Sequence, residues 1–203
     1  MPFFSRRQKF NDNGGNIEYI IAGLGNPGKK YESTRHNVGF LALDMISEKY
    51  NIRISRIKFK SVCGEGKIGD KRVLLLKPQT FMNNSGEALR EAMSFYKITP
   101  DKCIIILDDI SLEPGIIRIK QKSSDGGQKG MKSIIYLTGS DEYPRIKMGI
   151  GKKPHPDYEL ADWVLSKITK NEIPAIKTAL ENSVAAAQLI VDGKIDEAMN
   201  KFN

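Results

Sequence analysis

The segment Cys103–Asp109 constrains the fold more than any other part of the chain, because CIIILDD is an almost unbroken apolar run. A strand of a half-exposed sheet alternates apolar and polar residues, whereas a strand covered on both faces is apolar nearly throughout. The run therefore predicts a central strand with a layer of structure on each face. A chain of 203 residues has room for one such domain.

The segments around this run alternate between extended and helical patterns. Residues 17–25, IEYIIAGLG, predict a strand, and apolar residues at helical spacing follow over residues 38–46. Turn signals at residues 64–66 and 69–71 predict hairpins, so some strands are expected to run antiparallel. The prediction is an α/β fold, with a single-domain three-layer α/β/α architecture and a twisted mixed β-sheet flanked by helices.

Charge and cysteine content narrow the partners and the location. The chain has 32 Lys and Arg against 24 Asp and Glu, a net charge of +8, which favours polyanions such as nucleic acid or an acidic membrane surface. No apolar stretch approaches the roughly 20 residues that span a bilayer.

Cys63 and Cys103 lie far apart in the sequence, so we expect no disulfide and a cytoplasmic location. Residues 1–16 predict a flexible N-terminal tail before a domain at residues 17–203.

A literal GxGxxG follows the first predicted strand, at Gly23, Gly25 and Gly28. In a dinucleotide fold the helix starts within the glycine turn, so that its N-terminus meets the pyrophosphate. Here Pro27 interrupts the motif, and the helical pattern resumes only later. The favoured interpretation is a tight strand exit, with nicotinamide binding as the alternative. We expect no cofactor.

Polar side chains at the edges of predicted elements are candidates for catalysis. His36 stands where a loop becomes a helix, and Asp108 ends the central strand, where a carboxylate could orient a histidine. Helix capping or surface exposure are the alternatives for these residues. Asn26 and Asn83 carry amides that can donate to a developing oxyanion, or that serve turns. No GxSxG elbow is present, so water is the expected nucleophile of a hydrolase.

Metal binding is not expected from this sequence. It has two histidines, His36 and His155, and no CxxC or HExxH spacing.

Three blocks of sequence resemble the ordered motifs of bacterial peptidyl-tRNA hydrolases. They are GLGNPGKKYESTRHNVGF, KPQTFMNNSGEAL, and LDD followed by LEPG and GGQKGMKSI. The resemblance implies a metal-free, monomeric, single-domain α/β enzyme that cleaves the ester joining a peptide to the 3′ ribose of tRNA. Its partner would be peptidyl-tRNA, held at the acceptor stem and the 3′ CCA end.

The same resemblance implies roles for individual residues. His36 would be the general base and Asp108 its orienter, with Asn26 and Asn83 binding the peptide and its carbonyl group. Tyr31 and Met82 would line the peptide cleft. The residues that would bind tRNA are basic and lie on two predicted strands: Arg118, Lys120, Arg145 and Lys147.

One block departs from the family pattern. Where the family usually has GGHNG, residues 126–130 are GGQKG, so Lys129 replaces an asparagine that contacts the peptide. A lysine cannot accept a hydrogen bond from a peptide N–H, although it can donate to a carbonyl or meet a phosphate. This change raises a competing hypothesis, a relative that binds RNA without hydrolysing it. Retention of His36 and Asp108 favours the hydrolase.

Overall fold

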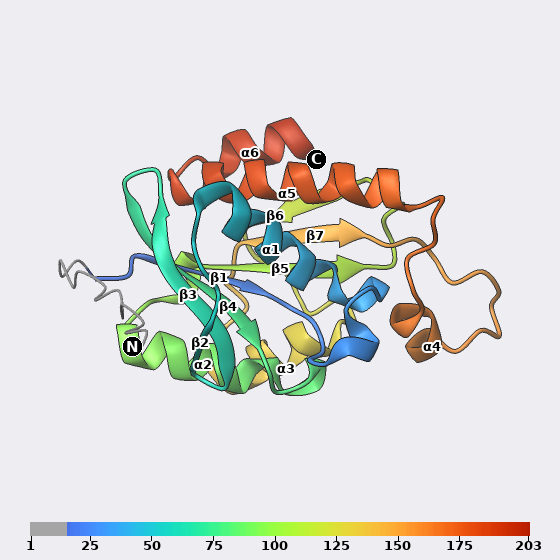
Figure 1. Ribbon diagram of the computed structural model, residues 1–203, viewed down its shortest axis with the longest axis horizontal. Helices are drawn as coiled ribbons and strands as arrows, with labels where there is room; N and C mark the ends of the chain where they lie inside the picture. Colours follow the sequence, from blue (N-terminus) through green and yellow to red (C-terminus); the bar gives the residue numbers. More distant parts are fainter. Residues whose placement is uncertain (1–15) are drawn as a thin grey trace, which may run out of the picture.

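The computed structural model describes residues 16–203, and the predicted tail lies outside the described residues apart from its last position. Within them, strands form one sheet in the order β2-β3-β4-β1-β5-β7-β6 (Figure 1). The strands are β1 (Tyr19–Gly23), β2 (Arg56–Lys58), β3 (Ser61–Ile68), β4 (Lys71–Pro78), β5 (Cys103–Asp109), β6 (Ile117–Lys120) and β7 (Arg145–Gly149). The helices are α1 (Val38–Tyr50), α2 (Ser85–Tyr96), α3 (Lys129–Thr138), α4 (Leu160–Leu165), α5 (Ile173–Val191) and α6 (Ile195–Phe202), and the 3₁₀ turns η2 (Arg35–Asn37) and η3 (Met82–Asn84) precede α1 and α2.

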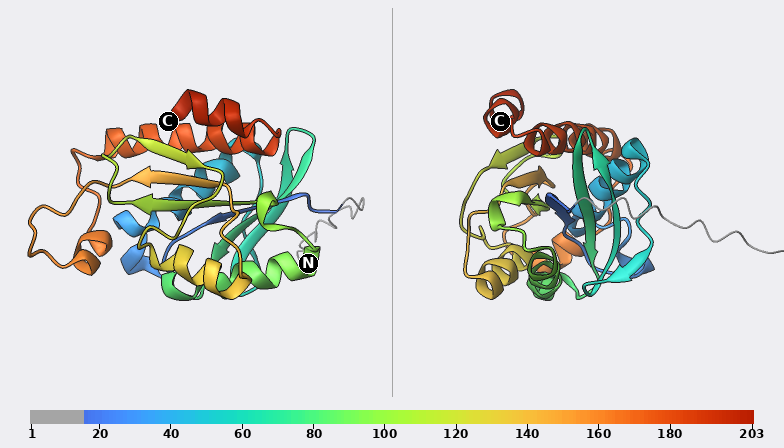
Figure 2. Two further views of the ribbon diagram at one scale, coloured as in Figure 1. Left: turned by 180° about the vertical axis from the view of Figure 1, so that it is seen from behind. Right: turned by 90° about the vertical axis from the view of Figure 1, so that its left-hand side faces the viewer.

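Two apolar cores lie on opposite faces of this sheet. Helices α1, α5 and α6 cover one face, and α2 and α3 cover the other (Figures 1 and 2). Along β5, Ile104 and Ile106 point into the first core, whereas Ile105 and Leu107 point into the second. These four residues are at most 1% exposed, as expected of a strand covered on both faces. The predicted three-layer architecture is confirmed. No helix in the described part of the chain is long and apolar enough to cross a membrane.

The sheet is mixed, as the sequence predicts. The inner strands β4, β1, β5 and β7 are parallel, and antiparallel pairs close both edges. From β1 the chain passes through α1, β2 and β3 to β4, which lies on one side of β1. From β4 it passes through α2 to β5, which lies on the other side of β1. The carboxyl ends of β1 and β5 therefore form a topological switch point, where α/β sheets commonly bind ligands. Asn26 follows β1 at this point, and Asp108 lies near the end of β5.

The turn predicted at residues 64–66 is wrong, because β3 runs straight through it and pairs with β4 along its whole length. The hairpin turn comes earlier, at Phe59 and Lys60, whose φ angles are 54° and 49°. Neither residue type signals such a turn, which usually contains Asn or Gly. Gly64 serves close packing instead, since a Cβ there would lie 2.3 Å from a backbone carbonyl oxygen of the preceding loop. The turn predicted at residues 69–71 is confirmed between β3 and β4.

Glycines bring the start of α1 against the ends of β1 and β5. A Cβ on Gly39 would lie 2.5 Å from the carbonyl oxygens of Leu24 and Ile106, and one on Gly23 would lie 2.2 Å from the carbonyl oxygen of Gly39. The helix can approach the strands this closely only because both residues lack a side chain. The GxGxxG pattern thus serves a tight strand exit, in which the chain leaves β1 directly against the start of α1.

Replacement of Gly39 by alanine is expected to lower the free energy of unfolding by about 2–3 kcal/mol, because the added methyl group has no space between helix and strands. Urea denaturation followed by circular dichroism measures the effect. Glu48→Ala, at an exposed position of the same helix, is the control and should stay within about 0.5 kcal/mol. Equal stability of the two variants would contradict the packing argument.

Candidate active site

His36 and Asp108 meet although 72 residues separate them in the sequence. His36 lies in η2, directly before α1, and Asp108 is the penultimate residue of β5. His36 Nδ1 and Asp108 Oδ2 are 2.7 Å apart, and the two residues are 8% and 4% exposed. Because an ionised carboxylate only accepts hydrogen bonds, this contact selects the tautomer with the proton on Nδ1, in which a neutral imidazole presents the lone pair of Nε2. An imidazole held in this way is suited to take a proton from water.

A cleft of about 700 Å³ opens beside this pair. One wall consists of polar residues at the ends of β1 and β5 and in the loop before α3. The opposite wall is the apolar side of α4, which lies beyond the carboxyl ends of β5 and β7 (Figure 1). The residues that line the cleft include Asn26, His36, Phe81, Met82, Asn83, Asp108, Asp109, Gln128, Lys129, Lys147, Leu160, Val164 and Leu165. The predicted catalytic residues therefore share one concave surface.

Asn26 is held in place through both its backbone and its side chain. Its backbone N–H donates to Asn37 Oδ1 and its carbonyl accepts from Asn37 Nδ2, each at 2.9 Å. Its side-chain Oδ1 accepts from the Met82 N–H at 2.8 Å. Since the oxygen is occupied, the Nδ2 group is what Asn26 can offer to a ligand in the cleft. This orientation fits a hydrogen-bond donor to a carbonyl or an oxyanion.

The rim of the cleft contains a residue that sequence analysis missed. Phe81 is 51% exposed and has a φ of 57°, a conformation that costs a residue with a side chain about 1–3 kcal/mol. The predicted cleft residue Tyr31 meets its ring edge-on, with the centroids 6.4 Å apart. Tyr31 thus reaches the rim through Phe81, whereas Met82 and Asn83 line the cleft directly. The strained backbone is the signal for Phe81, and only the structure displays it.

The loop before α3 places Gln128 and Lys129 at the cleft. Gln128 Nε2 donates to Asp108 Oδ1 at 3.0 Å, and Gln128 Oε1 accepts from the Met131 N–H at 2.7 Å. Lys129 is exposed and is the first residue of α3. Sequence analysis predicted Lys129 but missed Gln128, although both stand in the block that departs from the family pattern.

Strands β6 and β7 bring together the four basic residues for which tRNA contacts are predicted. Their antiparallel register pairs Arg118 with Lys147 and Lys120 with Arg145. Directly paired residues, and residues two apart on one strand, share a face of the sheet, so the four side chains form one block. Arg118 and Lys120 are exposed, and Lys147 reaches the cleft.

Asp109 and Arg145, two charged residues of this region, are held by partners within the protein. The pKa of Asp109 is raised by burial, but hydrogen bonds from Lys147 and Ser111 outweigh that effect and hold it below its ordinary value. Asp109 therefore pairs with Lys147, at 2.7 Å, rather than with His36. The prediction that Arg145 contacts tRNA is wrong, because its side chain is fully buried and donates to backbone carbonyl groups of Ser124 and Asp141.

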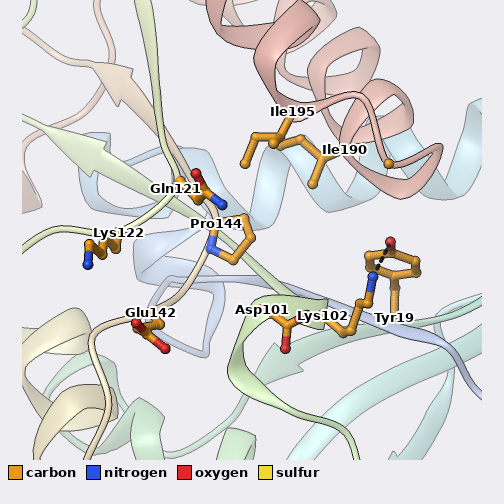
Figure 3. A pocket seen from close by; sticks show the side chains of 10 residues that line it. Tyr19, Asp101, Lys102, Gln121, Lys122, Glu142, Pro144, Ile190 and Ile195 are labelled. Atoms are coloured by element: carbon orange, nitrogen blue, oxygen red, sulfur yellow. Dashed lines mark hydrogen bonds between the residues drawn. The ribbon is translucent and has the colours of Figure 1, made fainter.

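A second cavity, of about 450 Å³, lies at the opposite end of the strands, beside the amino ends of β1, β5 and β7 (Figure 3). In its lining, the ammonium group of Lys102 donates to the hydroxyl of Tyr19 at 3.0 Å, and Asp101 and Glu142 add negative charge. It lacks the residues that the sequence predicted for catalysis. In the part of the chain that the structure describes, no three His, Cys, Asp or Glu side chains cluster so that they could hold a metal ion.

Comparisons with known proteins agree with the geometry of the cleft. A family model described as peptidyl-tRNA hydrolase matches residues 20–203. The chain belongs to this family. A peptidyl-tRNA hydrolase from Agathobacter rectalis is 50% identical over 186 residues, which cover 91% of this chain and all of that protein. One from Caldanaerobacter subterraneus is 51% identical over 185 residues, or 91% of this chain and 99% of that protein.

A solved structure extends the comparison to three dimensions. The crystal structure of peptidyl-tRNA hydrolase from Acinetobacter baumannii is 33% identical to this chain, with a TM-score of 0.87 over 94% of this chain and 97% of that one. Family membership makes the protein a hydrolase, and family and fold together support peptidyl-tRNA hydrolysis.

In this member of the family, Arg35 anchors the apolar wall of the cleft. Its guanidinium donates twice to Glu172, at 2.7 and 2.8 Å, and once to Ser166 Oγ at 3.0 Å. It also stacks on Trp163 of α4, with 3.8 Å between the guanidinium carbon and the ring centroid. Because Arg35 precedes His36, one 3₁₀ turn holds both His36 and the attachment of α4.

The Arg35–Glu172 pair predicts a loss of stability in acid. Burial raises the pKa of Glu172, but hydrogen bonds from Arg35 and Thr169 outweigh it and lower the pKa from 4.5 to about 2. The unfolded chain therefore binds more protons between these values, so the contribution of the pair is present above pH 4.5 and is lost as pH falls toward 2. Glu172→Gln should be less stable than the unmodified chain by about 2 kcal/mol at pH 7.

Urea denaturation at pH 7, 4 and 3 tests this prediction, and the difference between Glu172→Gln and the unmodified chain should shrink as the pH falls. Glu181→Gln is the matched control, because Glu181 is exposed and its contact with Lys177 spans 3.8 Å. A difference for Glu172→Gln that stays constant over this range would contradict the assignment.

Proposed function

We propose that this chain hydrolyses the ester between a peptide, or an N-blocked aminoacyl group, and the 3′ ribose of tRNA, using water activated by His36. The observation that carries the proposal is the 2.7 Å contact between His36 Nδ1 and Asp108 Oδ2 at the cleft. Water, a base and amide donors can carry ester hydrolysis without a metal or cofactor. We further propose that the enzyme acts as a monomer in the cytoplasm.

His36 supplies the proton transfers of the proposed reaction. Its Nε2 takes a proton from water while the water oxygen attacks the ester carbonyl carbon, which gives a tetrahedral intermediate. When the intermediate collapses, the bond to the ribose oxygen breaks, and the imidazolium returns its proton to that oxygen. The products are tRNA with a free 3′ hydroxyl group and a peptide carboxylic acid, which releases its proton to solvent as the carboxylate. Such transfers contribute about 10²–10⁴-fold in rate, and Asp108 stabilises the imidazolium that forms between them.

Asn26 and Asn83 supply neutral hydrogen bonds to the substrate. Asn26 has its oxygen occupied by the Met82 N–H, so its Nδ2 group can donate to the carbonyl oxygen as negative charge develops there. A donor in this role contributes about 3–4 kcal/mol to the transition state. Asn83 is exposed in η3 at the cleft and can bond the peptide backbone.

Preference for blocked substrates follows from the two walls of the cleft. Leu160, Val164 and Leu165 form an apolar surface opposite the amides, and Phe81 extends it at the rim. A peptide bond can use both surfaces. On these amide and apolar surfaces a free α-ammonium group would lose water without gaining a partner, so free aminoacyl-tRNA should be a poor substrate.

Basic residues support the proposal that the substrate is a tRNA. Arg118 and Lys120 are exposed on β6, and Lys147 lies between them and the cleft. This block can hold the phosphates of the acceptor stem while the 3′ CCA end enters the cleft. Lys129, at the cleft itself, can meet a phosphate or donate to a carbonyl group of the substrate.

His36→Ala is expected to reduce hydrolysis of N-acetyl-aminoacyl-tRNA by roughly 10²–10⁴-fold, because the general base is lost. Release of N-acetyl-amino acid over time measures the rate, and tRNA binding should stay intact. His155→Ala is the matched control, since the other histidine is 68% exposed in its side chain. An unmodified chain that binds tRNA without turnover would instead support an RNA-binding relative. Equal rates on free and N-acetylated aminoacyl-tRNA would contradict the specificity argument.

Lys120→Ala is expected to raise KM with little change in kcat, because the lysine is proposed to hold a phosphate away from the reacting bond. The slope of log KM against log salt concentration should also fall by about one. Lys177→Ala, an exposed lysine on α5, is the control for the loss of one charge. The same KM and salt slope in both variants would remove Lys120 from the tRNA-binding surface.

A further inference from the structure

Gln128 occupies a position for which its residue type is poorly suited. It is the N-cap of α3, and its Oε1 accepts from the Met131 N–H at 2.7 Å. Short side chains such as Ser, Thr, Asp and Asn are strongly preferred at N-caps, because they reach the backbone with little loss of freedom. A local rule broken in this way often marks a functional constraint. Capping alone therefore does not account for glutamine here.

The other end of the same amide meets the catalytic pair. Gln128 Nε2 donates to Asp108 Oδ1 at 3.0 Å, while Asp108 Oδ2 faces His36 Nδ1. Asp108 is 4% exposed, so both of its carboxylate oxygens need hydrogen-bond donors from the protein. Gln128 and His36 supply one donor each, and together they fix the plane of the carboxylate.

The orientation of the Gln128 amide is determined by its neighbours. A flipped amide would place its oxygen against Asp108 Oδ1 and its NH₂ group against the Met131 N–H, which are two repulsive contacts. Gly130 makes room for this arrangement, since a Cβ there would lie 2.6 Å from Met82 Sδ and 3.0 Å from Gln128 Oε1. The two hydrogen bonds of the amide thus hold it in the geometry that serves Asp108.

Gln128 also connects Asp108 to the amide that faces the substrate. Its Nε2 lies 3.1 Å from Met82 Sδ, and the Met82 N–H donates to Asn26 Oδ1. One side chain therefore contacts both the orienter of the base and the residue that holds the oxyanion donor.

We propose that Gln128 is a positioning residue, which orients Asp108 toward His36 and ties this pair to the start of α3. Its role in turnover rests on the hydrolysis proposed above, whereas its effect on the His36–Asp108 hydrogen bond does not. Without Gln128, Asp108 can rotate to seek another donor for Oδ1, and the hydrogen bond to Nδ1 lengthens. Misplacement of a catalytic group by about 1 Å costs up to 10²-fold in rate.

Gln128→Ser separates positioning from capping. Serine is a better N-cap than glutamine, so α3 should keep its stability, but its hydroxyl group is too short to reach Asp108 while it caps the helix. We expect kcat for N-acetyl-aminoacyl-tRNA to fall about 10- to 100-fold, with KM within about twofold of the unmodified enzyme. Gln188→Ser is the control for the same substitution elsewhere, because it removes an amide that accepts a side-chain hydrogen bond from Tyr50 on the other face of the sheet.

A spectroscopic measurement without substrate completes the test. A buried imidazole N–H bonded to a carboxylate exchanges slowly and gives a downfield proton resonance, which His36→Ala would assign. We expect this resonance in the unmodified protein and in Gln188→Ser, and its broadening or loss in Gln128→Ser. An unchanged resonance with unchanged kcat in folded Gln128→Ser would overturn the proposal, as would an effect on KM alone. If the unmodified protein has no hydrolase activity, the function fails, but the resonance still decides the role of Gln128.

Discussion

The hydrogen bond between His36 and Asp108 depends on how closely α1 approaches the central strands. Gly23 and Gly39 let the start of the helix lie on the backbone of β1 and β5, and η2 then holds the imidazole at the carboxyl end of β5. A side chain at either glycine would separate the helix from the strands. The geometry of the His36–Asp108 pair therefore rests on backbone packing in the core, which tolerates little change in volume.

The cleft combines two surfaces with different construction. The polar surface is a network in which the protein holds the side-chain oxygen of Asn26 and both ends of the Gln128 amide. The apolar surface is a short helix, α4, attached to the same 3₁₀ turn through Arg35. A bound peptide could use both surfaces, because its backbone requires hydrogen bonds and its side chains gain from apolar contact. A single turn of chain, η2, thus aligns His36 with the apolar wall of the cleft.

The positions of the positive charges follow from strand register and cannot be deduced from the net charge of the chain. Pairing of β6 with β7 assembles four cations on one face, but their surroundings divide their roles. Arg145 is buried and holds the neighbouring loop, Lys147 neutralises Asp109 at the cleft, and Arg118 and Lys120 face solvent. Only the exposed pair can exchange counterions freely for phosphates.

The sequence by itself determined the layered α/β architecture, the central strand and the polar residues that are proposed for catalysis. Each of these follows from local pattern, because the apolar run of β5 requires cover on both faces and polar residues at strand ends are recognisable by position. Tertiary structure alone decided that Arg145 is buried, that Phe59 and Lys60 form the hairpin turn, and that Gln128 reaches Asp108. Those features depend on which atoms distant segments bring together. A residue type such as arginine or glutamine can lie in solvent or in a buried network, so its identity alone does not decide between them.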